Sequence, residues 1–307
     1  MLIEAAVTTT WRPRRAVAAA LTLASLGRGR RDPCHRVTGD GAVWRTSRTQ
    51  TGPVTYRVAQ RGPSEIDASA WGPGAAELID GLPALLGSDD DDGSFEPRHP
   101  LLHKAFHRLP GLRVPRTGRV IEALIPAVIE QRVLGVDARA AWCRLVARHG
   151  EAAPGPAPDG MRVPPTAKAW AGLQSWEWHL AGVDPGRAST ARAGASVAHR
   201  LEECVLLDRP AAYRRLQAVP GIGLWTAAEV GARAFGDADA VSLGDYHLPG
   251  LIGHALAGHP LSHDEVEPFL EPWRPHRYRV VRLLELTPGA YPPRRGPRRS
   301  RPDFRQL

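Results

Sequence analysis

Apolar residues recur at intervals of three and four through most of the second part of the chain, which is the spacing of helices that bury one face. Runs typical of strands nearly vanish after about residue 96. The helical spacing is found over 118–135, 137–149, 167–174, 188–207, 211–218, 224–235, 247–257, 263–270 and 276–286. We therefore expect an all-α bundle over residues 106–290.

The N-terminal part has a different pattern. Between Cys34 and Ala59, two runs rich in β-branched and aromatic residues each lie beside a glycine turn signal, as the strands of a β-hairpin do. Helices are expected over 73–87 and over 16–26, where the apolar run is too short, and too closely followed by arginines, for a signal peptide. The whole pattern predicts an α+β fold, in which an N-terminal domain with a small antiparallel sheet, residues 1–105, precedes the helical bundle.

Polar segments separate these elements. Residues 88–94 include four consecutive aspartates, which we interpret as a solvated acidic loop rather than a metal site. Residues 151–165 form a loop rich in proline and glycine, and 291–307 form a basic tail that we expect to be mobile. Arginines in this tail would add affinity for a polyanion, although a solvated terminus has the same composition.

The composition is that of a globular protein. Of the 307 residues, 43% are hydrophobic and 23% are charged, enough for packed cores in at least two domains. The formal net charge of +8 favours a polyanionic partner such as nucleic acid, although a biased genomic base composition would give the same excess of arginine. The cysteines are far apart and lack metal-ligand spacing, so we expect them to be reduced. No apolar stretch is long enough to span a bilayer, and we expect a cytoplasmic, nucleoid-associated protein without a membrane partner.

The most informative segment is Leu216–Val230, whose sequence LQAVPGIGLWTAAEV places Pro220 and two glycines between two predicted helices. Gly221 and Gly223 leave the turn without Cβ atoms, so its backbone amides can approach an anion. The N-terminus of the following helix adds positive partial charge. Such a turn suits a DNA phosphate, but a turn between helices needs glycine in any case, so the segment alone leaves a purely structural role open.

A carboxylate follows this segment. Asp245 lies in the run AVSLGDYHLP, twenty residues after Trp225. A helix of about 12 residues spans about 18 Å, so the returning loop can bring Asp245 back toward the mouth of the hairpin. Taken alone, an aspartate before a helix is most often an N-cap, which is the alternative to a catalytic role.

The hairpin, L-x-x-V-P-G-I-G-x-W-T-A, resembles at nearly every position the helix-hairpin-helix of the HhH-GPD superfamily of base-excision DNA glycosylases. The run Asp245-Tyr246-His247 resembles the catalytic segment of that family. Residues 121–146 and 271–277 resemble two further family segments, so the resemblance covers roughly residues 110–290.

The resemblance implies a fold and an activity. The helical part would consist of two lobes with the active-site cleft between them, and the hairpin, 211–235, would hold a DNA phosphate. Asp245 would stabilise the positive charge that develops on the deoxyribose as the N-glycosidic bond breaks, and would orient the attacking water. The residues that the family assigns to the phosphate contact correspond to Gly221, Gly223 and Thr226.

The residue at position 225 bears on the branch of the family. Members that also cleave the DNA backbone have a lysine where this chain has Trp225, so the resemblance implies a monofunctional enzyme that leaves an abasic site. Tryptophan at this position is typical of the alkylation-repair branch, 3-methyladenine DNA glycosylase II, and an indole suits a flipped, cationic base. A core tryptophan is the alternative for this residue considered alone.

The resemblance also implies the surroundings of the flipped base. The base pocket would include Trp225, Tyr246, Glu229 and Glu285. The two glutamates lie where relatives can have aromatic residues, so the pocket is expected to be more polar. In the family, the residue after a helix-ending Gln, here Gln131, enters the duplex as a wedge, which indicates Arg132 or, as an apolar alternative, Val133.

No organic cofactor is expected, and the cysteine pattern of the iron–sulfur branch is missing from the sequence. The family holds a monovalent cation, Na+ or K+, through main-chain carbonyls that correspond to Gln217, Val219 and Ile222. The expected partner is double-stranded DNA with a damaged base, and the expected state is a monomer. Two alternatives stay open: a non-catalytic helix-hairpin-helix DNA-binding protein, and a glycosylase for deaminated or oxidised bases.

Overall fold

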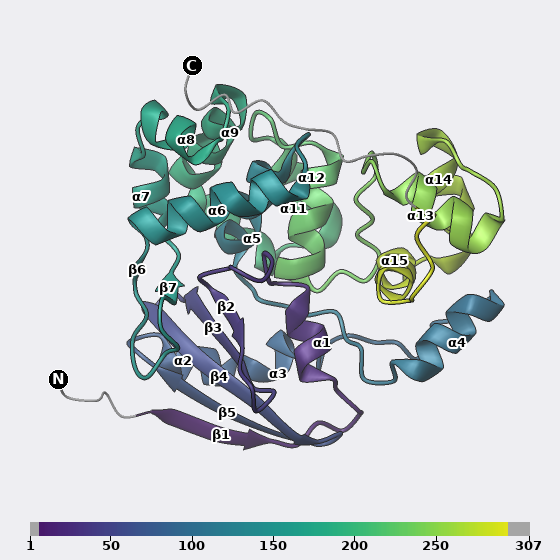
Figure 1. The fold of residues 1–307 in the computed structure, drawn as a ribbon, viewed down its shortest axis with the longest axis horizontal. Coiled ribbons are helices and arrows are strands. Elements are labelled where there is room, and N and C mark those ends of the chain that lie inside the picture. The colour runs from purple at the N-terminus through teal and green to yellow at the C-terminus, as the bar shows by residue number, and fades with distance from the viewer. Residues whose placement is uncertain (1–5, 294–307) are drawn as a thin grey trace.

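A five-stranded antiparallel sheet occupies the N-terminal part of the computed structural model, which describes residues 6–293 (Figure 1). Its order is β1-β5-β4-β3-β2, with β1 Val7–Trp11, β2 His35–Val37, β3 Val43–Arg48, β4 Pro53–Gly62 and β5 Glu65–Trp71. The small antiparallel sheet and its β3–β4 hairpin were predicted. Strands β1 and β5 were not, because β1 is largely exposed and the inward positions of β5 include only small alanines beside Ile66.

Short helices pack on this sheet and share one hydrophobic core with it. They are α1 Ala19–Ala24, α2 Ala75–Asp80 and α3 Leu82–Leu85. The expected helix over 16–26 is confirmed as α1, which buries Ala19 and Leu23. The single helix expected over 73–87 is wrong: the helix is divided at Gly81, and Pro83, which has no amide hydrogen, lies in the first turn of the second piece.

A first group of helices surrounds the core that includes the buried tryptophans Trp142, Trp170 and Trp178. Its members are α5 Val120–Glu130, α6 Gly135–His149, α7 Ala167–Gly172, α8 Ser175–Ala181, α9 Pro185–Ser196, α10 Ala198–Glu202, η1 Glu203–Leu206, α11 Arg209–Gln217, α12 Leu224–Val230 and η2 Gly231–Phe235. The expected loop over 151–165 contains one short ladder, between β6 Glu151–Ala152 and β7 Arg162–Val163.

A second group of helices packs around a separate core. It consists of α4 Pro100–Arg108, α13 Leu248–Ile252, η3 Gly253–Ala257, α14 His263–Leu270, η4 Glu271–Trp273 and α15 Arg277–Glu285. Helix α4 precedes the first group in sequence but lies beside α15 (Figure 1). The segment 236–247 connects the first group to the second, and its residue Val241 is part of the second core.

The acidic loop differs from the prediction, because it is not solvated along its length. Asp90 is buried and accepts hydrogen bonds from the Arg279 guanidinium and, at 3.0 Å, from the Val114 amide. Asp92 pairs with Arg113. Two of the four consecutive aspartates, Asp90 and Asp92, therefore fasten helix α15 and the segment before α5 to the acidic loop, because a buried carboxylate requires charged or hydrogen-bonding partners.

The expected mobile tail, 291–307, falls almost entirely on residues 294–307, outside the described part of the chain. Within residues 6–293, no helix combines the length and the apolar character needed to cross a membrane.

Candidate active site

The hairpin joins α11 to α12, and its two glycines have different surroundings. Gly221 adopts a φ of +86°, and a Cβ atom there would collide with the Thr190 hydroxyl, so the position requires glycine. Gly223 precedes α12, and a Cβ atom there would meet no atom within 4 Å. The open side of the turn, toward which Gly223 faces, is therefore the side on which an anion can approach the first amides of α12.

The end of α5 is tied to this turn. The Gln131 side-chain amide donates hydrogen bonds to the Gly221 carbonyl at 2.9 Å and to the Thr226 hydroxyl at 2.7 Å. Thr226 is buried, so in this structure its hydroxyl serves the contact with Gln131. Two segments that are far apart in the sequence are thus fixed side by side.

The residues after Gln131 form a sharp turn. The helix expected over 118–135 ends at Glu130, because neither Gln131, with a ψ of 124°, nor Arg132, with a φ of +52°, has a helical backbone. Arg132 is exposed, whereas Val133 is partly buried against the core of the first helical group. Of the two candidate wedge residues, Arg132 therefore faces solvent, whereas Val133 packs inward.

The hairpin carbonyls that the resemblance assigns to a cation have free acceptor capacity. Among the described residues, the carbonyls of Gln217 and Ile222 accept no hydrogen bond, and that of Val219 accepts one, from the Ile222 amide at 3.1 Å. A carbonyl oxygen has two lone pairs, so Val219 retains one. Hard cations bind such oxygen ligands, so these three carbonyls are the ones that would hold a monovalent cation at the hairpin.

Asp245 lies in the segment between the two helical cores, and its carboxylate is held from two sides. Oδ2 accepts a hydrogen bond from the Trp225 indole nitrogen at 3.2 Å, and Oδ1 accepts one from the His247 amide at 2.7 Å. The side chain is half-buried. The structure thus brings together the two residues, twenty positions apart, on which the sequence argument depended.

The aromatic residues of the expected base pocket differ in exposure. Trp225 is partly buried and its ring lies against Asp245. Tyr246 is 84% exposed and packs edge-on against His247, so it does not line a closed cavity in this structure.

The two glutamates of the expected pocket are both paired. Glu229 accepts hydrogen bonds from the Ser242 hydroxyl and from Arg233, the latter at 2.7 Å. Burial would raise the pKa of Glu229, but the charge of Arg233 and the Ser242 hydrogen bond outweigh it and hold the pKa below its usual range. Glu285 pairs with Arg282 on α15.

Two residues near Asp245 carried no sequence signal. Ser242 connects the Asp245 segment to Glu229. Tyr291 lies close enough to Glu285 and Asp245 that their negative charges act on it: burial chiefly, and these carboxylates with it, raise the pKa of Tyr291 to about 12. A single serine in a loop and a tyrosine in an expected tail have no spacing that predicts such neighbours.

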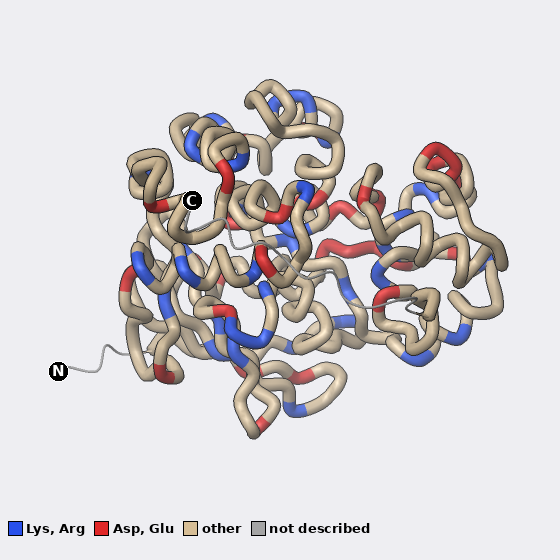
Figure 2. Tube along the Cα trace, turned by 45° about the horizontal axis from the view of Figure 1, so that its top comes forward, with Lys and Arg blue, Asp and Glu red and all other residues tan. Residues whose placement is uncertain are grey.

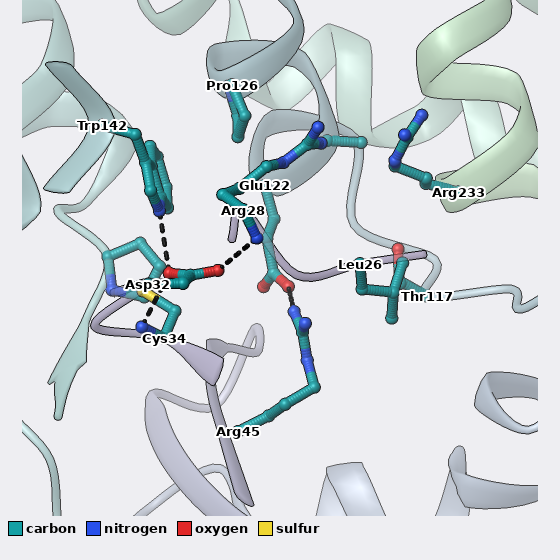
Figure 3. Close-up of a pocket in the computed structure, with 12 residues that line it drawn as sticks. Leu26, Arg28, Asp32, Cys34, Arg45, Thr117, Glu122, Pro126, Trp142 and Arg233 are labelled. Carbon is teal, nitrogen blue, oxygen red and sulfur yellow. Dashed lines mark hydrogen bonds and ion pairs between the residues drawn. The ribbon is translucent and has the colours of Figure 1, made fainter. Parts of the chain in front are cut away.

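A small cavity lies between the sheet and α5 (Figure 3). It is about 20 Å³, enough for one water molecule, and Arg28, Asp32, Arg45, Glu122 and Arg233 are among its lining residues. Asp245 is not among them. This cavity belongs to a buried polar network between the sheet and α5, so we do not assign the flipped base to it.

Basic residues are distributed widely over the described chain. Figure 2 shows arginines and lysines on the sheet and on both helical groups, interspersed with acidic residues, rather than gathered in one patch. The net charge alone therefore does not locate a nucleic-acid surface. The candidate surface is instead inferred from the geometry of the hairpin.

Comparison with known proteins supports the resemblance drawn from the sequence. No family model matches the chain. Over 197 residues, 61% of the chain, it is 29% identical to a Mycobacterium tuberculosis protein described as a probable bifunctional transcriptional activator/DNA repair enzyme AlkA. The chain matches 37% of the length of that relative.

The fold is shared with solved glycosylases. The 3-methyladenine DNA-glycosylase from Archaeoglobus fulgidus superposes with a TM-score of 0.75 at 18% identity, over 90% of this chain and 96% of that one. The 8-oxoguanine glycosylase/lyase from Clostridium acetobutylicum superposes with a TM-score of 0.70 at 14% identity, over 93% and 96%. The predicted resemblance to DNA glycosylases is confirmed: the chain shares the fold of both enzymes and part of the sequence of the AlkA relative. The name of the second neighbour shows that the fold also occurs in a glycosylase that is a lyase.

Proposed function

From this resemblance we propose that the protein is a monofunctional DNA glycosylase, which flips an alkylated purine out of duplex DNA and hydrolyses its N-glycosidic bond. The observation that carries the proposal is the contact between Trp225 and Asp245, because it places an oriented carboxylate beside an aromatic ring at the N-terminal end of the hairpin's second helix. A protein that only bound the DNA backbone would have no use for this carboxylate.

Catalysis would depend on the charge of Asp245. As the glycosidic bond breaks, the deoxyribose acquires oxocarbenium character, and a fixed carboxylate stabilises that charge without reorganising during the reaction. The same carboxylate would orient the water that attacks the sugar. An alkylated purine already carries positive charge and leaves readily, so the site requires no strong general acid.

The DNA would lie across the hairpin. The open side of Gly223 would admit a phosphate to the amides at the start of α12, and Arg132 would fill the space vacated by the base. The flipped nucleotide would enter a cleft between the two helical groups, where segment 236–247 carries Asp245. A monovalent cation, held by the carbonyls of Gln217, Val219 and Ile222, would add positive charge at the phosphate.

Two observations support hydrolysis without strand cleavage. Trp225 occupies the position at which lyases of this superfamily carry a lysine. The lysines of the chain, Lys104 and Lys168, belong to α4 and α7, which contribute none of the site residues described above. No lysine amine is therefore placed to attack the sugar and form a Schiff base.

The test is release of free base from methylated duplex DNA by the wild type and by Asp245→Asn. We expect the wild type to release 3-methyladenine and to leave abasic sites that heat or alkali, but not the enzyme, converts to breaks. Asp245→Asn keeps the shape but removes the charge, so excision should fall at least about a hundredfold while DNA binding persists.

The same assay on duplexes that contain hypoxanthine or 8-oxoguanine tests the alternative, a glycosylase for deaminated or oxidised bases. Release of one of these bases, without release of 3-methyladenine, would overturn the alkylation assignment while retaining the glycosylase. Binding without release from any duplex would overturn the enzymatic function.

A further inference from the structure

Three residues on one side of the hairpin's second helix make successive contacts. Trp225, Glu229 and Arg233 follow at intervals of four, which places them on the same face of α12 and its continuation η2. Trp225 contacts Asp245, Glu229 contacts Ser242, and Arg233 pairs with Glu229.

Ser242 and Asp245 are the two ends of one backbone turn. The Asp245 amide donates to the Ser242 carbonyl at 3.0 Å, and Gly244 between them has a φ of +85°. Because Ser242 is bound to Glu229 and Asp245 is bound to Trp225, both ends of this turn are fastened to the same helix.

The Glu229 carboxylate is occupied by these contacts. One oxygen accepts from the Ser242 hydroxyl and the other from Arg233, and the side chain is only 14% exposed. Little of it is left to meet a flipped base, although the sequence alone suggested a base-pocket role.

The surroundings of Glu229 keep its carboxylate ionised. Arg233 and Arg28 both line the small cavity shown in Figure 3, and both act favourably on the Glu229 charge. Arg28 also pairs with Glu130, the last residue of α5, at 3.1 Å. Two largely buried arginines thus act on the Glu229 carboxylate, as a largely buried charge requires.

We propose that Glu229 is a positioning residue, which holds Ser242 and thereby fixes the turn that presents the Asp245 carboxylate. This inference rests on the proposed function, since it assigns Glu229 a part in the orientation of the catalytic group. Its effect is on the chemical step and not on the binding of DNA or of the base.

The experiment measures single-turnover base excision and, separately, the affinity for a lesion duplex in which a non-hydrolysable nucleotide analogue carries the damaged base. Ser242→Ala removes the contact while leaving the Glu229–Arg233 pair intact. We expect it to lower the excision rate roughly ten- to hundredfold, since small misplacement of a catalytic group has effects of this size, and to change DNA affinity by less than about twofold.

Three further variants sharpen the comparison. Ser242→Thr retains a hydroxyl and should restore most of the rate. Glu229→Gln should lower the rate, and combined with Ser242→Ala it should be no slower than the slower single variant, because both affect one contact. Ser262→Ala removes a similar serine–glutamate contact, 2.8 Å to Glu265 on α14, and should leave the rate unchanged.

Two results would overturn the inference: a wild-type excision rate in Ser242→Ala, or weaker binding of the lesion duplex by Glu229→Gln at an unchanged rate, which would make Glu229 a base contact. Amide hydrogen exchange over residues 240–247 gives a readout independent of activity, and should be faster in Ser242→Ala than in wild type. If the wild type releases no base from any duplex, the proposed function fails, whereas hydrogen exchange still decides whether Glu229 holds this turn.

Discussion

The indole nitrogen of Trp225 donates a hydrogen bond to Oδ2 of Asp245 across 3.2 Å. The other carboxylate oxygen accepts from the His247 amide at 2.7 Å. Because each oxygen accepts a hydrogen bond, the carboxylate has a fixed orientation before any substrate binds. Each oxygen still has a free lone pair. Such preorganisation is what electrostatic stabilisation of a developing charge requires.

Replacement of Trp225 by phenylalanine tests this contact. Trp225→Phe keeps an aromatic ring for the base but removes the donor to Asp245, and a hydrogen bond to a charged group contributes about 1.5–3 kcal/mol. We expect the single-turnover excision rate to fall roughly tenfold or more. Trp176→Phe, at an exposed tryptophan on α8, is the control and should keep the wild-type rate. An equal rate in both variants would contradict a role for the indole nitrogen.

The two hairpin glycines form a matched pair of substitutions. Gly223→Ala should fold normally, because its backbone is compatible with a side chain and the new methyl group meets no protein atom, but the methyl group should hinder a DNA phosphate. We expect DNA affinity to fall about tenfold at unchanged thermal stability, a loss of roughly 1.4 kcal/mol.

Gly221→Ala should behave in the opposite way. Its positive φ and the collision with Thr190 predict a loss of at least about 2 kcal/mol in the free energy of unfolding. Urea unfolding and fluorescence anisotropy with labelled duplex measure the two quantities. Unchanged DNA binding by Gly223→Ala would show that the phosphate does not approach this side of the turn.

The acidic loop offers a test of stability with an internal control. Asp90→Asn breaks the buried pair with Arg279, where both side chains are 2% exposed, and should lower the free energy of unfolding by about 3–5 kcal/mol. Asp91→Asn changes the neighbouring carboxylate, which is 82% exposed, and should change it by less than about 0.5 kcal/mol. Similar urea midpoints for the two variants would contradict the buried anchor.

This loop also shows the limit of prediction from the sequence. Four consecutive aspartates are usually solvated, and nothing in their local pattern indicated that Arg279, 189 positions away, would enclose one of them. The helical bundle was predictable because apolar spacing is a local property. Strand β1 was not, since an exposed edge strand has little alternation.

In the candidate site, too, some residues could be predicted from the sequence and others could not. Asp245 and Trp225 were identified by a motif with fixed spacing, and the structure brings them into contact. Glu229 was identified only by its position, and its partner Ser242 became visible only when the fold brought segment 236–247 back to α12. A residue's role as a pocket wall or a support depends on such tertiary contacts.

We expect the partly buried histidine His35 on β2 to make the folding stability depend on pH. Burial chiefly, and the charge of Arg45 beside it, lower the pKa of His35 from 6.5 to about 4. Between these values the unfolded chain binds a proton that the folded protein does not, so folding stability should fall as pH decreases from about 6.5 to 4. Since each pH unit corresponds to 1.36 kcal/mol, the whole effect is on the order of 3 kcal/mol.

The measurement is urea unfolding between pH 7 and pH 4.5. His35→Gln cannot take up the proton, so it should lose about 2 kcal/mol less than the wild type over this range, whatever its stability at pH 7. His263→Gln, at an exposed histidine on α14, should keep the wild-type slope. If His35→Gln also keeps that slope, the histidine is protonated in the folded protein, and the contact between its Nδ1 and the Arg45 guanidinium at 3.2 Å cannot persist at low pH.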